Sequence, residues 1–312
     1  MAEPKRILAL AVGDPRFSQL IDPGKSYGVR PYIAGLVEGL TNRGRKLGTD
    51  YVIDYRQNWY DNIHKGEPFQ DLKSAQLIYV MSTSVMRAAG RHTKEPPVVF
   101  SNCSEHRDEE MVKAKRATGF SARRTQTAGE CFDFFFQTVP TLEEVLILHR
   151  DDYDVSDRAV QLIKDAASRR HVKPTTINVT SRADLEEKLS KLPERASGTV
   201  ARIGLQVTPV DLLFAATPWI IKCVQEAKNL PAFFPVTDWV PTGLGGYGVP
   251  QFRCGEKTAD QVDQILWAKG PQSSLPVVVE ADKKEDFDWV VSRAAAKALG
   301  LDVSTIAGMR IV

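Results

Sequence analysis

Short apolar runs alternate with longer amphipathic segments along most of the chain. The first run, Ile-Leu-Ala-Leu-Ala-Val, occupies residues 7–12, and residues 28–45 follow with apolar side chains at helical spacing. Short uninterrupted apolar runs are typical of strands that are buried on both faces of a sheet. Strands of this kind that alternate with helices predict parallel sheets covered by helices, and therefore an α/β fold.

The alternating pattern occurs in two series. The apolar runs predict strands at 7–12, 51–55, 77–80 and 98–100 in the first series and at 145–148, 176–179 and 232–236 in the second. The amphipathic segments predict helices at 28–45, from about 84, and at 125–138, 156–170, 182–192 and 218–228. Pro218 would lie near the first turn of the last of these helices, as helix starts prefer. Two series predict two similar α/β lobes, and the glycine-rich segment 241–248 is the best candidate for a flexible crossing between them.

Composition narrows the class of protein. The chain has 312 residues, 43% of them hydrophobic, and a formal net charge of +2, which is ordinary for a globular protein of one large or two medium domains. Basic and acidic residues are interspersed, so no nucleic-acid surface is expected. No stretch approaches the ~20 apolar residues that cross a bilayer. Residues 1–6 lead directly into the first predicted strand without a signal peptide, which leaves a cytoplasmic protein or a mature form whose export signal was removed.

No motif for catalysis, a metal or a cofactor is evident. The chain lacks the nucleophile-elbow, zinc-protease, P-loop and dinucleotide-binding patterns. The four cysteines form no Cys-x-x-Cys pair, and the five histidines have no metal-ligand spacing. The sequence alone does not decide whether any two of the cysteines form a disulfide. Cys103 and His106 are a conceivable nucleophile pair, but no third residue is evident to orient them. We therefore expect a protein that is not an enzyme and that carries neither a cofactor nor a metal.

Ligands of α/β sheets bind beyond the carboxyl ends of the strands, so the strand-to-helix junctions are the places to search. Ser82, Thr83 and Ser84 lie between a predicted strand and a predicted helix. Their hydroxyls can cap the helix, and its free N–H groups can also receive a ligand carboxylate. Ser101, Asn102 and Cys103 follow the next strand and form a second polar junction.

Further candidate ligand-binding residues lie at the other junctions. Asp14 and Phe17 are on the long loop after the first strand, and Phe120 and Ser121 are in the segment expected to cross between the lobes. In the second lobe the candidates are Tyr153, Thr208 and Asp238. Asp238 suits a ligand ammonium group, and it is equally suited to cap the following turn. Arg123 and Arg124, which follow Ser121 closely in the chain, are suited either to bind an anionic group or to lie on a solvated surface.

The order of these segments resembles the substrate-binding proteins of ABC transporters, in particular the type that binds tryptophan or tyrosine. The resemblance extends nearly from end to end. It rests on "KRILALAV", "YVIDYR", "LIYVMSTSVMRAA", "PPVVFSNCSEH", "ATGFSARRT", "GGYGV" and the tail "SSLPVVVEADKKEDFDWVVSRAAAKALGLDV". The segment 194–213 matches poorly, and Ser82-Thr83 stands where the family usually has Gly-Thr.

The resemblance implies two Rossmann-like lobes joined by a three-stranded hinge, as in type I periplasmic binding proteins. Lobe 1 is expected to comprise 1–118 with 244–275, and lobe 2 to comprise 119–243 with 276–312; whether the last helix returns to lobe 1 is left open. Matching positions imply that Ser82, Thr83 and Ser84 receive a carboxylate, and that Asn102, Phe120 and Asp238 line the cleft between the lobes.

The function that the resemblance implies is capture of a small ligand, with amino acids or other carboxylate-bearing metabolites as the leading class. The protein is expected to be a periplasmic or cell-surface monomer that closes about a hinge and delivers its ligand to ABC permease subunits. A ligand-sensing domain of the same fold without transport is the alternative, and an enzyme on an α/β fold is a weaker one.

Overall fold

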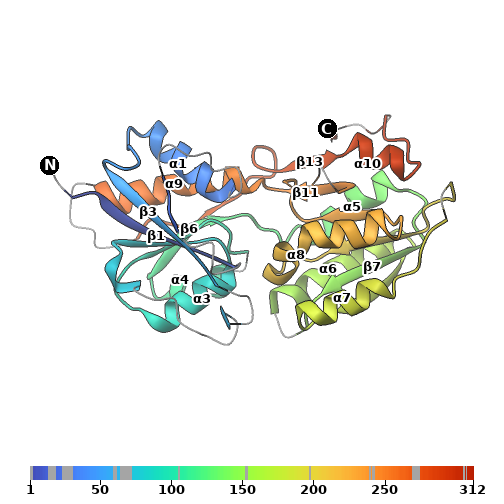
Figure 1. Ribbon diagram of the computed structural model, residues 1–312, viewed down its shortest axis with the longest axis horizontal. Coiled ribbons are helices and arrows are strands. Elements are labelled where there is room, and N and C mark those ends of the chain that lie inside the picture. The colour runs from blue at the N-terminus through green and yellow to red at the C-terminus, as the bar shows by residue number, and fades with distance from the viewer. Residues whose placement is uncertain are drawn as a thin grey trace. The chain divides into compact units, whose positions relative to one another are not determined.

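The computed structural model describes residues 3–12, 19–22, 31–58, 62–63, 72–104, 106–151, 154–196, 198–238, 240, 243–268, 275–304, 306 and 308–312. The chain folds into two compact units (Figure 1). Unit 1 comprises 1–123 and 251–281, and unit 2 comprises 124–250 and 282–312. The chain therefore passes between the units three times.

Unit 1 is built on a seven-stranded sheet with the strand order β12-β6-β5-β4-β1-β3-β2. The strands are β1 (Lys5–Val12), β2 (Gln19–Leu20), β3 (Tyr51–Asn58), β4 (Leu77–Val80), β5 (Val98–Phe100), β6 (Ala117–Ser121) and β12 (Val279–Glu280). All neighbouring strands are parallel except β2 and β3. The α-helices of the unit are α1 (Pro31–Asn42), α3 (Thr83–His92), α4 (Glu110–Lys113) and α9 (Gln251–Trp267).

The apolar run that opens the chain forms the centre of this sheet. Residues 7–10 of β1 have no exposed surface, and the strand lies between β3 and β4. Helices α1 and α9 lie side by side although they are far apart in sequence (Figure 1). They can approach this closely because residue 35 is a glycine. A Cβ at this position would lie only 1.9 Å from the carbonyl oxygen of Phe252. Residues 251–267 thus return to unit 1 and cover its sheet.

Unit 2 has a second seven-stranded sheet with the strand order β14-β13-β11-β10-β9-β7-β8. The strands are β7 (Glu144–His149), β8 (Lys173–Asn178), β9 (Ile203–Val207), β10 (Ala232–Phe234), β11 (Gly245–Gly248), β13 (Asp288–Val291) and β14 (Arg310–Ile311). Only β11 and β13 are antiparallel among these neighbours. The helices are α5 (Ala128–Thr138), α6 (Asp154–Arg169), α7 (Arg182–Ser190), α8 (Asp211–Ile221) and α10 (Arg293–Ala298).

The two α/β lobes expected from the sequence are thus confirmed, but their boundaries differ from the expected ones. Residues 119–121 were expected in lobe 2, but they form the end of strand β6 and belong to unit 1. Residues 245–248, expected to belong to lobe 1, form strand β11 of unit 2, so the glycine-rich segment supplies a strand and the crossing falls after residue 250. Residues 276–281 extend unit 1, and helix α10 belongs to unit 2.

One expected helix also begins elsewhere. The predicted helix 218–228 is preceded by seven further helical residues, because α8 begins at Asp211 and contains Pro218 in its interior. The π-helical segment Lys222–Glu226 follows it directly. The sequence placed Pro218 at a helix start because an interior proline costs a backbone hydrogen bond. No helix in the described part of the chain is long and apolar enough to span a membrane.

Candidate ligand-binding faces of the two units

The hydroxyl residues Ser82–Ser84 are at the start of helix α3, directly after strand β4. Ser82 is the N-cap, and its Oγ accepts a hydrogen bond from the N–H of Val85 at 3.3 Å. Capping the helix therefore explains the presence of one hydroxyl residue, Ser82, among the three. All three side chains are at least nine-tenths buried. The carboxyl end of β4 therefore presents a helix N-terminus surrounded by hydroxyl groups, which is a suitable environment for an anionic group.

The second polar junction follows the neighbouring strand β5 and is tied to the first. The N–H of Ser101 donates to the carbonyl oxygen of Val80 at 3.0 Å. The Thr83 hydroxyl donates to Sγ of Cys103 at 3.4 Å. These contacts hold the two junctions together, so Ser82–Ser84 and Ser101–Cys103 form one continuous group at the ends of two neighbouring parallel strands. We call this group the unit 1 face.

Strand β6 adds a further polar residue to the unit 1 face. Phe100 and Gly119 are register partners in β5 and β6, and continuing that register brings Asn102 level with Ser121. Oδ1 of Asn102 and Oγ of Ser121 are buried without a hydrogen-bond partner among the described residues. Buried polar atoms are normally paired, so these two atoms at adjacent strand ends are available to a ligand.

Strand β4, which leads into Ser82–Ser84, carries a buried tyrosine. Burial raises the pKa of Tyr79 well above its usual range, and the neighbouring Ser101 partly opposes that increase. The Tyr79 hydroxyl therefore stays protonated and acts as a hydrogen-bond donor. It donates to the carbonyl oxygen of Tyr32 at 3.5 Å, and the side chain has no exposed surface.

The structure gives Cys103 and His106 different neighbours. His106 begins a short 3-10 helix, and its Nε2 lies 3.5 Å from a carboxylate oxygen of Glu280. Cys103 instead accepts from Thr83. A base that activates a thiol must lie within hydrogen-bond reach of it, and neither of these two contacts joins the imidazole to the thiol. All four cysteines are free thiols, which resolves the disulfide that the sequence left open.

In unit 2 the corresponding strand ends belong to β7 and β9. The N–H of Arg150 donates to Oγ of Ser156 at 3.0 Å, and this oxygen lies 3.4 Å from Oγ1 of Thr208. The Thr208 hydroxyl also donates to the carbonyl oxygen of Leu148 at 2.9 Å. These bonds join the ends of β7 and β9 to the first turn of α6. The hydroxyl of Thr208 is therefore engaged in structure, and its role toward a ligand stays a prediction.

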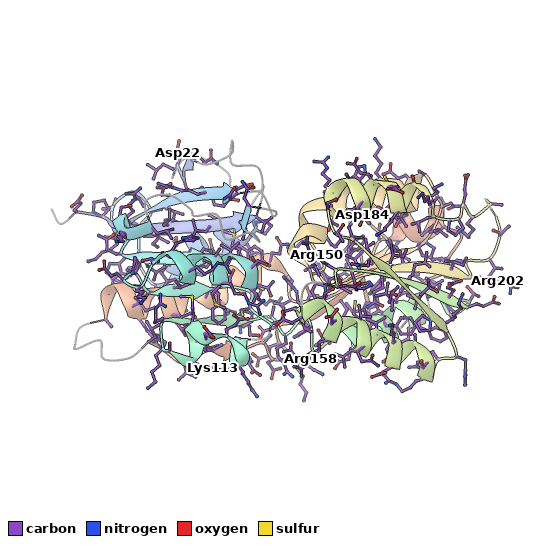
Figure 2. The ribbon with its side chains drawn as sticks, turned by 90° about the horizontal axis from the view of Figure 1, so that it is seen from below. Asp22, Lys113, Arg150, Arg158, Asp184 and Arg202 are labelled. Carbon is purple, nitrogen blue, oxygen red and sulfur yellow. The ribbon has the colours of Figure 1, made fainter. Side chains whose placement is uncertain are left out.

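Two arginines that follow strands are buried. The sequence suited Arg124 either to an anionic group or to a solvated surface, and it did not single out Arg150. Arg150 (labelled in Figure 2) is 5% exposed and follows β7. Arg124 is 1% exposed, follows the end of β6 by three residues, and donates to the carbonyl oxygen of Val249 at 3.2 Å. A solvated surface, one interpretation of Arg124 from the sequence, is wrong. The signal that would have identified both is their position in the segments that follow strands, one residue after β7 for Arg150 and three residues after β6 for Arg124.

The remaining predicted site residues have different outcomes. Asp14, Phe17 and Tyr153 lie outside the described residues. Phe120 has no exposed surface and is the register partner of Val279 in β12. Asp238 is partly buried in the turn after β10. Their roles toward a ligand stay predictions.

Each unit is thus a mostly parallel α/β sheet with polar groups at its strand ends, which is the architecture of type I periplasmic binding proteins. A solved structure from Streptococcus pneumonia, described as an ABC domain in complex with L-Trp, has a TM-score of 0.75 at 16% identity and covers 100% of both chains. A conserved domain protein from Vibrio cholerae has a TM-score of 0.73 at 19% identity, with 99% of each chain covered.

Sequence comparison identifies the family. Residues 27–306 match the family described as "ABC transporter substrate binding protein". The chain is also 19% identical to a tyrosine-binding protein of Clostridioides difficile (strain R20291) over 274 residues, which are 86% of this chain and 76% of the relative. The protein belongs to the family of ABC transporter substrate-binding proteins, as the resemblance in its sequence indicated.

Proposed function

We propose that this protein is the extracytoplasmic solute-binding component of an ABC importer, and that its ligand is an amino acid or another small carboxylate-bearing metabolite. The observation that carries the proposal is the unit 1 face. There the N-terminus of α3 and the hydroxyls of Ser82–Ser84 lie at strand ends beside Asn102 Oδ1 and Ser121 Oγ, two buried atoms that have no hydrogen-bond partner among the residues described. A carboxylate at a helix N-terminus is stabilised by free N–H groups and by the helix dipole.

The proposed mechanism is hinge closure. Each unit offers polar groups at its own strand ends, and a ligand that contacts both sets favours the closed conformation. Asp238 of unit 2 is the proposed partner of a ligand ammonium group. The closed, loaded protein is the form that a membrane permease would recognise. The family and the amino acids named for two of its relatives support this assignment of ligand class.

A thermal-shift screen tests the ligand class. The full-length protein is heated with each proteinogenic amino acid, with aromatic acids, and with the corresponding amides and amines that lack the carboxylate. We expect a carboxylate-bearing compound to raise the unfolding midpoint by mass action, and its amide to be much less effective. A screen in which only uncharged or cationic compounds raise the midpoint would overturn the carboxylate class.

A matched pair of helix-cap variants separates binding from stability. Ser82 caps α3 and Ser181 caps α7 through the same kind of bond, at 3.3 Å and 3.2 Å. Both Ser82→Ala and Ser181→Ala should lower stability by about 1 kcal/mol, the usual cost of a lost N-cap. Only Ser82→Ala should weaken ligand binding. Equal affinities of the two variants would exclude the start of α3 from the site. Uptake into vesicles that contain the permease distinguishes a transport component from a ligand sensor.

A further inference from the structure

A cluster of potential metal ligands in unit 2 is not explained by the proposed function. His149 ends strand β7, Asp151 follows two residues later, and Asp157 is in the first turn of helix α6. One potential ligand atom from each of the three lies within 4.8 Å of the other two. In the part of the chain that the structure describes, this is the one group of at least three His, Cys, Asp or Glu side chains whose ligand atoms lie close enough together to hold an ion.

Regular secondary structure fixes the backbone of the cluster. The N–H of Val179 donates to the carbonyl oxygen of His149 at 2.8 Å, and the N–H of Asp151 donates to Oδ1 of Asn178 at 3.0 Å. Asn178 at the end of β8 and Val179 after it therefore hold the backbone of Asp151 and His149, and helix α6 carries Asp157. His149 and Asp157 thus lie on regular elements, which position ligands more precisely than a loop does.

The imidazole of His149 is the second observation that indicates a ligand. Its side chain is 6% exposed, and Nδ1 lies 3.1 Å from Oδ1 of Asp151. Nevertheless, neither ring nitrogen makes a hydrogen bond to a described residue. Buried polar nitrogens are normally paired. An imidazole nitrogen and a carboxylate oxygen that face each other without a hydrogen bond have the arrangement of two ligands of one ion.

The ordinary explanation of Asp157 is its place in the first turn of a helix, where the helix dipole favours an acidic side chain. This accounts for Asp157 and equally for Asp154 in the same turn. It does not account for a buried imidazole directed at the carboxylate of Asp151. The spacing His149-x-Asp151-x5-Asp157 follows no common metal motif, which is why the sequence led us to expect no metal.

We propose that His149, Asp151 and Asp157 bind a divalent first-row transition-metal ion, with Zn²⁺ as the probe. One nitrogen and two carboxylate oxygens are suitable donors for Zn²⁺, whereas Mg²⁺ prefers a set made of oxygens alone. Three protein ligands leave at least one coordination position for water or for a ligand group. A bound ion would join the end of β7 to the start of α6.

The surroundings of His149 also predict how strong the binding is. A metal-ligating histidine usually donates its other ring N–H to a carboxylate or carbonyl group, and this support raises metal affinity by 10–100-fold. Nε2 of His149 has no such acceptor among the described residues. We therefore expect binding that is specific but weaker than in structural zinc sites with complete outer-shell support.

Isothermal titration of the metal-free, full-length protein with ZnCl₂ is the first test. We expect one Zn²⁺ per chain and no comparable heat with MgCl₂. His149→Ala and Asp157→Asn should each weaken binding by about 100-fold or more, because losing a ligand costs more than losing outer-shell support. His171→Ala and Asp165→Asn are the matched controls, an exposed histidine and an exposed carboxylate further along α6, and they should bind as the wild type does.

Two further measurements keep the result decisive. Asp151 is 62% exposed in its side chain, so Asp151→Asn cannot disturb the core and replaces His149→Ala if that variant does not fold. The spectrum of the Co²⁺-substituted protein should lack thiolate charge-transfer bands, which excludes binding at the partly exposed Cys223. The proposal is overturned if Zn²⁺ does not bind, if it binds equally to the Asp151, Asp157 and control variants, or if Cys223→Ser abolishes binding.

Discussion

The hydroxyl of Thr83 donates a hydrogen bond to Sγ of Cys103 at 3.4 Å, and this contact joins the start of helix α3 to the residues after strand β5. The two residues are 20 positions apart in the chain. Both are buried, Thr83 at 5% exposure and Cys103 at 0%. A hydroxyl that donates to this thiol fixes the Thr83 side chain and thereby sets the spacing between the two polar junctions of the unit 1 face.

The Thr83–Cys103 contact should be measurable as an interaction energy. Thr83→Val keeps the shape of the side chain and removes the donor, and Cys103→Ala removes the acceptor. We expect each to lower the free energy of unfolding, with a coupling of about 0.5–1 kcal/mol in the double variant, because neutral hydrogen bonds contribute about 1 kcal/mol and sulfur is a weak acceptor. Urea unfolding of the four proteins gives the cycle. Strict additivity would show that the two side chains do not interact.

Gly119, two residues before Ser121 of the unit 1 face, should not tolerate a side chain. It has φ of +148°, and a Cβ at this position would lie 1.9 Å from the carbonyl oxygen of Phe100. Gly119→Ala must therefore separate β6 from β5 and displace Ser121. We expect a loss of more than about 2 kcal/mol in unfolding free energy and weaker ligand binding, since strain and overpacking act together.

Gly44→Ala is the control for this prediction. Gly44 also has a positive φ, +78°, but nothing lies within 4 Å of a Cβ built there. The backbone penalty alone should then cost about 1–2 kcal/mol and leave ligand binding unchanged. If the two alanine variants lost the same stability and kept the same affinity, the close approach of β6 to β5 would be irrelevant to the site.

The sequence predicted the architecture because that information is local. Buried parallel strands such as residues 7–12 and 77–80 are read from uninterrupted apolar runs, and both form strands in the structure. Strand β6 was missed because Ala-Thr-Gly-Phe-Ser has neither an apolar run nor alternation. What makes it a strand is its pairing with β5 and β12, which no local pattern reveals.

Which polar groups come together at the strand ends was predicted only in part, for a related reason. Position after a strand identified Ser82–Ser84 and Ser101–Cys103, and the structure brings these two groups together. Arg124 and Arg150 occupy the same kind of position, but arginine is usually exposed, so composition argued against them. Their burial depends on contacts with segments that are distant in sequence, such as the bond from Arg124 to Val249.

Thiol reactivity should follow burial. Cys103, Cys131 and Cys254 are buried, and Cys223 is partly exposed. Burial raises the pKa of Cys131 to about 12, so its thiolate is scarce at neutral pH. We expect DTNB to modify at most Cys223 in the native protein and four thiols per chain after unfolding. Modification of two or more thiols in the native state would contradict the burial of the other three. Cys223→Ser, which should leave the native protein unreactive, is the control.

The carboxylate of Asp54 should make unit 1 sensitive to acid. Burial of this side chain raises its pKa, but hydrogen bonds from Arg56 and Arg6, at 2.8 Å and 2.6 Å, outweigh that effect and leave the pKa below its usual value. A carboxyl group whose pKa is lowered on folding stabilises the protein above its unfolded-state pKa of about 3.9, and this stability is lost as the pH falls through the lower folded-state value. Asp54→Asn should therefore destabilise the protein in urea unfolding at pH 7, and the difference from the wild type should shrink steadily below pH 4. Asp165→Asn, on the exposed face of α6, should leave the free energy of unfolding at pH 7 close to that of the wild type. A difference for Asp54→Asn that stays constant from pH 7 to pH 2 would mean that its ionised form has no part in stabilising the fold.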